Sequence, residues 1–180
     1  MSGKKGFNDG PSSQSLFNNP TGICLDKKGN IFVVDYNNHC IRRISSEGEV
    51  STIAGVAGKQ GYCDGMKEQS MFSYPSGICM DKNGNLFVAD CWNHVFRKIS
   101  SNDGIVSLVA GIPMKEGSFD GEITKAQFRY PKGVVCDDDG NLFIVDSGNH
   151  TIRKISIFNG IVSTIAGIVG KSGHFDGKGK

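Results

Sequence analysis

The chain has 180 residues, of which 38% are hydrophobic and 21% charged, and its 20 Lys and Arg nearly balance 18 Asp and Glu. This composition excludes an intrinsically disordered chain, and a formal charge of +2 gives no electrostatic case for a nucleic-acid or membrane surface. No run approaches the roughly 18 apolar residues of a membrane span, and the first residues lack the apolar stretch of a signal peptide. We therefore expect no membrane contact and favour the cytoplasm, although the sequence itself leaves the compartment open.

Three copies of one pattern account for most of the chain. They span residues 20–55, 75–111 and 131–167, and each begins at a proline that is followed two residues later by glycine. A fixed period of this size indicates one supersecondary unit that is used repeatedly. The repeat therefore predicts the architecture more strongly than it predicts the function.

Each copy predicts four short strands. Gly-containing turns join the first two apolar runs, which is a hairpin signal. The third run alternates apolar and basic residues, with the period of two that is typical of strands. The predicted strands are 22–26, 31–35, 40–44 and 50–54, then 77–81, 86–90, 95–99 and 106–110, then 133–137, 142–146, 151–155 and 162–166. We therefore expect about twelve hairpin-linked strands.

Long links separate the copies, at residues 56–74 and 112–130. Each carries an Asp-Gly pair and then a phenylalanine three positions before the proline of the next copy. Links of this length are often functional. We interpret their polar tips as solvated and expect the phenylalanines to fasten each link onto the neighbouring sheet; these are Phe17, Phe72 and Phe128.

The repeated pattern G-N-[IL]-F-[VI]-x-D-x-x-N-H-x-[IF]-R-[RK]-I resembles the NHL repeat, which is named after an Asn-His-Leu triplet. The resemblance covers almost the whole chain. The leucine of the triplet is replaced by Cys40, Val95 and Thr151, while the Asn-His pair is present in all three copies.

The resemblance implies an all-β fold: a partial β-propeller of three four-stranded antiparallel blades, at residues 20–55, 75–111 and 131–167. Residues 1–19 would then be the incoming link from a preceding blade position, and residues 168–180 the start of a further link. Three blades cannot close a ring, and a repeat unit needs neighbours on both sides. We therefore expect further blades to come from a longer chain or from a second copy.

Polar residues recur at fixed positions in each copy: an aspartate at the end of the second strand, a histidine four residues later and an arginine three residues after that. A carboxylate at a strand end can accept hydrogen bonds from an imidazole or a guanidinium on the next strand. Because an active site usually breaks the symmetry of a repeat, we interpret this set as a structural clamp. Its members are Asp35, His39, Arg42, Asp90, His94, Arg97, Asp146, His150 and Arg153.

Residues that differ between the copies are better candidates for recognition. Trp92 is the only tryptophan; it lies in the connection between the second and third strands, beside Asn93, and Tyr36 holds the equivalent region of the first copy. Trp and Tyr are enriched in binding hot spots. Tyr36, Trp92 and Asn93 are therefore candidate partner-binding residues, and packing against the adjacent loop is an equal alternative.

No residue of the sequence is assigned to catalysis, to a cofactor or to a metal. The six cysteines show neither a CxxC pair nor the spacing of a zinc site. We interpret them as small buried residues in a reduced compartment. The run 137–139, three aspartates, lacks the spacing of an EF-hand and reads as a hairpin turn. No Ser-His-Asp order or phosphate-binding loop is present.

The favoured hypothesis is a non-enzymatic propeller scaffold that binds a partner, in the first place a protein. The first alternative is part of a metal-dependent lyase or lactonase-like hydrolase whose ligands lie partly in other blades. The second alternative is an RNA-binding propeller, since the third strand of each copy carries a basic pair such as Arg42-Arg43. Both alternatives stay open at this point.

Overall fold

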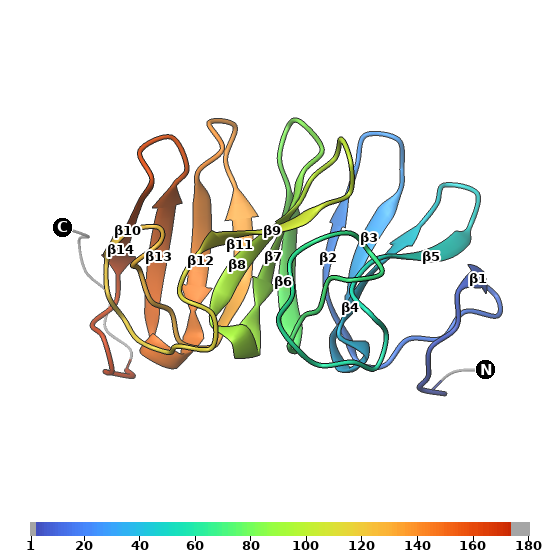
Figure 1. Cartoon of the computed structure of the whole chain (residues 1–180), viewed down its shortest axis with the longest axis horizontal. Coiled ribbons are helices and arrows are strands. Elements are labelled where there is room, and N and C mark those ends of the chain that lie inside the picture. The colour runs from blue at the N-terminus through green and yellow to red at the C-terminus, as the bar shows by residue number, and fades with distance from the viewer. Residues whose placement is uncertain (1–2, 174–180) are drawn as a thin grey trace.

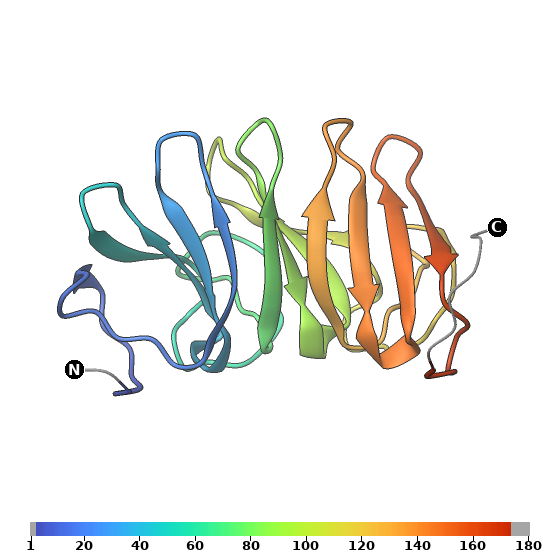
Figure 2. The ribbon, with the colours of Figure 1, turned by 180° about the vertical axis from the view of Figure 1, so that it is seen from behind.

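The computed structural model describes residues 3–173, which form three antiparallel β-sheets that stand side by side (Figures 1 and 2). We call these sheets blades 1, 2 and 3 in chain order. Blade 1 contains β2 (Pro20–Leu25), β3 (Ile31–Asp35), β4 (Cys40–Ile44) and β5 (Glu49–Ala54). Blade 2 contains β6 (Pro75–Met80), β7 (Leu86–Asp90), β8 (Val95–Ile99) and β9 (Val106–Ala110). Blade 3 contains β11 (Pro131–Cys136), β12 (Leu142–Asp146), β13 (Thr151–Ser156) and β14 (Ile161–Ala166).

The prediction of an all-β chain with four hairpin-linked strands in each copy is confirmed. The first strand of each blade begins earlier than predicted, at the repeated proline. The reason is a β-bulge, across which the proline still pairs with the aspartate that ends the next strand, as Pro20 does with Asp35. None of the described residues forms a helix that is both long and apolar enough to cross a membrane.

The long links add a strand at the outer edge of the blade that follows them. The two-residue strand β1 (Gly10–Pro11) pairs with β5, and β10 (Gly121–Glu122) pairs with β14. In blade 2 a single bridge between Gly65 and Val106 takes the same place. Each link therefore covers its own blade and does not run free. Of the further link predicted at 168–180, residues 174–180 lie outside the described residues.

Apolar side chains fill the two spaces between neighbouring blades. Phe32 and Ile41 of blade 1 pack with Val88 of blade 2, and Phe72 is buried in the same layer. Phe128 is buried in the corresponding layer between blades 2 and 3. Phe72 and Phe128 thus fasten their links from inside the apolar layers, where each removes a large ring from water.

Blades 1 and 3 each turn one face away from blade 2, and these two faces have no neighbouring blade among the described residues. Ile23 in blade 1 is 63% exposed, whereas its counterpart Ile78 in blade 2 is 5% exposed. Val135 in blade 3 is 61% exposed, whereas its counterpart Cys79 is buried. The two outer faces therefore carry the apolar pattern of the inner faces without a cover. We call them the open faces.

Candidate binding surface

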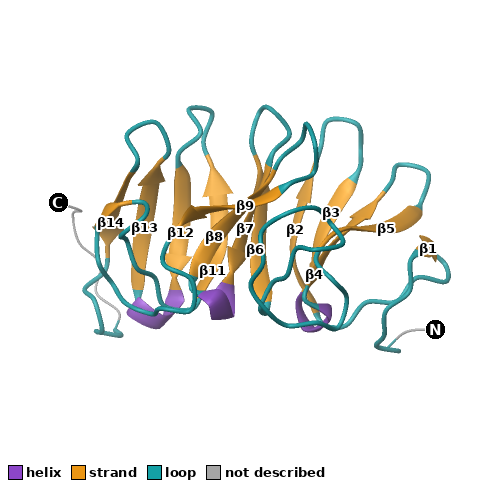
Figure 3. Cartoon of the chain, in the orientation of Figure 1, coloured by secondary structure: helices purple, strands orange, loops and turns teal. Residues whose placement is uncertain are grey.

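A single turn of 3-10 helix follows the second strand of each blade, and the three turns lie along one edge of the molecule (Figure 3). They are η1 (Tyr36–Asn38), η2 (Cys91–Asn93) and η3 (Ser147–Asn149). Each turn is followed by a histidine with a positive φ of 55° to 59°. Such a backbone is uncommon outside glycine and persists only where the surroundings determine it. The repeated Asn-His pair therefore marks a tight chain reversal.

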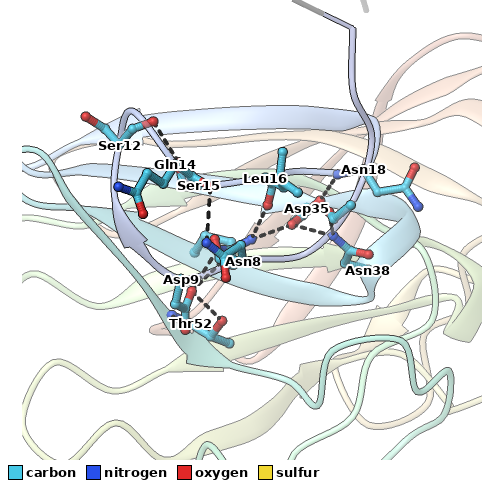
Figure 4. A network of polar contacts seen from close by, with 12 residues as sticks. Asn8, Asp9, Ser12, Gln14, Ser15, Leu16, Asn18, Asp35, Asn38 and Thr52 are labelled. Carbon is cyan, nitrogen blue, oxygen red and sulfur yellow. Dashed lines mark hydrogen bonds and ion pairs between the residues drawn. The ribbon is translucent and has the colours of Figure 1, made fainter. Parts of the chain in front are cut away.

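The aspartate that ends the second strand of each blade lies at the centre of a buried hydrogen-bond network. In blade 2, Asp90 accepts hydrogen bonds from the Asn93 side chain at 2.8 Å, the Ser73 backbone N–H at 2.7 Å and the Arg97 guanidinium at 3.0 Å. Figure 4 shows the equivalent aspartate of blade 1, Asp35, with its neighbours. The side chains of these aspartates and arginines are fully buried. Each charged group has therefore lost its hydration and needs a partner of opposite charge.

A second carboxylate, which sequence analysis did not assign, reaches each arginine from the long link. Asp9 accepts hydrogen bonds from Nε and Nη2 of Arg42 at 3.0 and 2.7 Å. It also accepts one from the backbone N–H of Thr52 at 3.0 Å, and Figure 4 shows these two residues side by side. Asp120 holds Arg153 of blade 3 through the same two nitrogens, whereas Asp64 pairs with Arg97 of blade 2 through Nη2 alone. Each arginine therefore joins a link to its blade. The Asp-Gly pair that recurs in the links is the signal that could have found it.

Aromatic rings cover the guanidinium groups. Arg97 lies between the rings of Tyr62 and Phe72, at 4.4 and 5.2 Å from the ring centroids, in contacts of the cation–π type. Its Nε atom is buried and has no hydrogen-bond partner, whereas Arg42 and Arg153 both donate from Nε to the carboxylate of the link. The network of blade 2 is therefore the least completely bonded of the three.

Burial shifts the acid strength of two of these aspartates. It raises the pKa of Asp90 from 3.8 to about 6, while the hydrogen bonds from Asn93 and Ser73 and the charge of Arg97 oppose the shift. Burial also raises the pKa of Asp146. Because loss of water disfavours the charged form, the carboxylate of Asp90 depends on its partners to stay ionised at neutral pH.

The histidines lie outside this network, which corrects the sequence interpretation. Nδ1 of His39 accepts a hydrogen bond from the backbone N–H of Tyr74 at 3.2 Å, and Nδ1 of His94 accepts one from Tyr130 at the same distance. Each of these histidines therefore links one blade to the start of the next. Burial lowers the pKa of both, which favours the neutral ring that an accepting nitrogen requires. His150 has no following blade among the described residues.

Four aromatic rings form a continuous row along the edge that carries the 3-10 turns. The ring centroids are 5.1 Å apart for Tyr36 and Tyr74, 4.9 Å for Tyr74 and Trp92, and 6.0 Å for Trp92 and Tyr130. Trp92 is 49% exposed and the tyrosines are half-buried. We call these four residues the aromatic row. It offers an exposed indole on a base of packed rings.

Tyr74 and Tyr130 complete the row, and sequence analysis did not assign them. Both have a positive φ, of 46° and 47°. Their rings pack edge-on against His39 and His94, with centroids 4.4 and 4.7 Å apart. The Tyr-Pro pair of the second and third copies was the available signal, and Asn19 holds this position in the first copy.

The three predicted partner-binding residues therefore do not form one surface. Tyr36 and Trp92 lie in the aromatic row with Tyr74 between them. Asn93 is buried, and its side-chain amide donates to Asp90 and to a backbone carbonyl of the link, both at 2.8 Å. The structure thus corrects the choice of Asn93, because its donors are already used within the fold.

The cysteines and acidic residues do not form a reactive cluster among the described residues, where no group of three or more His, Cys, Asp and Glu could hold a metal ion. Burial raises the pKa of Cys24 and Cys40 to about 12 and that of Cys91 to about 11. A thiol with so high a pKa is almost entirely protonated at neutral pH and is a poor nucleophile.

Radially arranged four-stranded sheets, joined by long links and packed through repeated apolar layers, define β-propeller blades. The sequence profile of the NHL repeat matches this chain three times, at residues 17–44, 72–96 and 128–155. The chain therefore contains three NHL repeats, and each match covers the first two strands of one blade and all or part of the third.

The chain is 30% identical over 188 residues to NHL repeat-containing protein 2 of Homo sapiens, which aligns with 90% of this chain and 26% of that protein. It is 27% identical over 248 residues to the chloroplastic protein SUPPRESSOR OF QUENCHING 1 of Arabidopsis thaliana, with 99% of this chain and 23% of that protein aligned. The chain thus spans about a quarter of the length of these relatives.

A solved structure from Bacteroides thetaiotaomicron, described as a structural genomics protein of unknown function, has a TM-score of 0.70 and 28% identity to this chain. The superposition covers 86% of this chain and 36% of that one. A gluconolactonase from Xanthomonas campestris has a TM-score of 0.61 at 11% identity, a likeness that shows the fold alone.

Proposed function

We propose that this chain is a non-enzymatic propeller scaffold and that it binds a protein partner through the aromatic row. The supporting observation is the position of Trp92, 49% exposed, against Tyr74 and Tyr130 on either side. Aromatic side chains supply large contact area at low entropic cost, and Trp and Tyr dominate binding hot spots. The backbone that holds these rings is determined by the buried networks beneath them, so the surface is preorganised.

The geometry favours this proposal over the two alternatives. A metal-dependent lyase or lactonase needs converging ligands, and because the described part of the chain offers no group of three, such a site would have to take ligands from other blades. An RNA surface needs clustered cations with stacking rings beside them, and the basic pairs do not provide such a cluster because one arginine of each pair is buried against aspartates. Of the remaining cations, Lys154 lies over the ring of Phe143.

Replacing Trp92 with alanine is expected to weaken capture of a protein partner about tenfold or more, since a central indole is worth about 2 kcal/mol or more in a hot spot. Stability should change by less than about 1 kcal/mol, because half of the side chain already contacts water. Quantitative affinity capture with the wild-type and W92A chains, together with thermal melts, measures both quantities. The matched control is Phe158→Ala, which removes an exposed ring from the β13–β14 turn, away from the aromatic row. Equal capture by W92A and wild type would contradict the proposal.

We also propose that further NHL blades pack on the two open faces, because Ile23 and Val135 are exposed at positions where blade 2 has the buried residues Ile78 and Cys79. Exposed apolar patches of this kind mark association sites. In sedimentation experiments the isolated chain should self-associate as its concentration rises, and Ile23→Glu or Val135→Glu should prevent it. The contrasting variant, Ile78→Glu, places the same charge inside the apolar layer and should unfold the chain. A wild-type chain that stays monomeric at high concentration would count against a second copy as the occupant.

A further inference from the structure

The hairpin turns of blades 1 and 2 stand side by side at the edge opposite the 3-10 turns (Figures 1 and 2). The side chains of these turns line a groove between the two blades. It encloses about 620 Å³, a volume typical of ligand pockets. Its walls are the β2–β3 turn on one side and the β6–β7 and β8–β9 turns on the other. The groove is separate from the aromatic row and does not depend on the proposed function of that row.

The floor of the groove is apolar and comes from both blades. Phe32 and Ile53 contribute from blade 1, and Met80, Leu86 and Ile99 contribute from blade 2. Phe32, Leu86 and Ile99 are almost wholly buried, so Ile53 and Met80, which are half-buried, supply most of the accessible apolar surface. Such a floor accepts an aliphatic or aromatic side chain but presents no open ring face on which a base could stack.

The rim of the groove is cationic. Lys27, Lys28 and Lys82 are exposed, and Arg43 lies below them, where its guanidinium donates to the Asn30 side chain at 2.8 Å. No ion pair within 4.0 Å neutralises these four cations among the described residues.

The two acidic side chains on the rim are committed to the turns. Asp26 accepts hydrogen bonds from the backbone N–H groups of Lys28 and Asn30 and from the Asn30 side chain, at 2.6 to 2.9 Å. Asp81 accepts the same three bonds within its own turn. These carboxylates shape the walls and keep their negative charge, and the four cations outnumber them in the lining of the groove.

The equivalent groove between blades 2 and 3 has an acidic balance of charge. It encloses about 530 Å³, and Asp138 and Asp139 line it at the position that Lys82 and Asn83 occupy in blade 2. Its cations are Lys98 and Lys82, and Lys82 lines both grooves. The hairpin turn itself is the same in both blades, since Asp137 and Asp81 make the same bonds. The fold therefore does not require the cations of the first groove, which makes them available for recognition.

We propose that the groove between blades 1 and 2 binds a short acidic peptide segment, which places an apolar side chain on the floor and carboxylates against Lys27, Lys28 and Lys82. Charge complementarity favours an acidic partner and raises its rate of association. The apolar floor binds an apolar side chain of the peptide, which a free phosphate or a simple anion lacks. The aliphatic floor favours a peptide over single-stranded RNA, whose binding sites rely on exposed stacking rings.

The test is fluorescence anisotropy of the whole chain with a fluorescein-labelled peptide of Glu and Asp around a central Leu-Phe pair. We expect saturable binding at low salt that weakens as salt screens the charges. The variant K27E/K28E/K82E should bind at least about tenfold more weakly. The charge-matched control, K59E/K115E/K125E, changes exposed lysines of the long links and should bind like the wild type.

Two further probes separate the sources of affinity. A peptide with Ser-Ser in place of Leu-Phe should bind about tenfold more weakly, because it loses the apolar anchor; equal affinity would overturn the anchored mode. An oligouridylate should bind more weakly than the peptide. The proposal is also overturned if the peptide does not bind at low salt, if both triple variants lose affinity equally, or if the RNA binds as tightly and loses affinity in K27E/K28E/K82E.

Discussion

Replacing Arg97 with methionine is expected to lower the free energy of unfolding by about 3–5 kcal/mol, the usual cost of leaving one partner of a buried ion pair without the other. Both side chains of the Arg97–Asp90 pair are fully buried, with 3.0 Å between Nη1 and Oδ2. Methionine keeps much of the length and all of the apolar stem of arginine, so the cost comes from the unpaired carboxylate and not from a cavity. Urea unfolding of the variant and the wild type measures it.

The cost of R97M should depend on pH in a defined direction. Burial raises the pKa of Asp90 from 3.8 to about 6 in the folded chain. The folded state therefore binds this proton more tightly than the unfolded state, and the contribution of Asp90 to stability falls as the pH rises from 3.8 to about 6. Below its folded pKa of about 6 the carboxyl of Asp90 is mostly protonated and needs Arg97 less. The stability difference between wild type and R97M should thus be larger at pH 8 than at pH 5, and the reverse order would contradict the assignment.

Two neighbouring variants control for a general loss of charge. Asp64→Asn removes the other carboxylate of Arg97, which is 45% exposed, so it should cost no more than about 1 kcal/mol. Lys98→Met replaces the next cation along β8, which is half-buried and has no ion pair among the described residues, and should change stability by less than about 0.5 kcal/mol. A graded series, with R97M far above the other two, is the expected result.

The repeat made the blades predictable but not the network that holds them. The strands follow from local patterns, so their number and order could be read from residues close together in the chain. The carboxylate of Asp9 lies far from Arg42 in sequence, and it reaches the guanidinium only because the link folds back along the outer edge of the blade. No local pattern encodes that return. The Asp-Gly pair recurs in each link, but its partner is visible only in three dimensions.

The contacts of the repeated histidine and of the aromatic row could likewise not be predicted from local sequence patterns. His39 stands between Asp35 and Arg42 in the repeated motif, which suggested one shared cluster. The positive φ of His39 instead sends its ring toward Tyr74 of the next blade. Trp92 could be singled out because it is unique, whereas the rest of the aromatic row depends on contacts between blades that the sequence does not specify.

Replacing Gly77 with alanine is expected to lower the free energy of unfolding by about 3 kcal/mol, at the upper end of the usual overpacking range. Gly77 does not have a positive φ, so its backbone conformation does not require glycine. A Cβ at this position would overlap the backbone carbonyl oxygen of Lys132 and lie 3.2 Å from the Cα of Gly133. Both obstacles are backbone atoms of β11 and cannot rotate away. β6 would have to move away from β11 and open the apolar layer between blades 2 and 3.

The matched variant is Gly133→Ala, at the same position of the repeat in blade 3. Its Cβ would meet only the side chain of Val145, at 3.0 Å, because no blade covers that face among the described residues. The expected cost is below about 1 kcal/mol, since a surface side chain can shift. Urea unfolding should therefore separate G77A from G133A, and equal costs would show that the glycine serves the strand and not the approach of the next blade. If a further blade does pack on this open face, G133A should leave folding intact and weaken self-association, which sedimentation of the same two variants would detect.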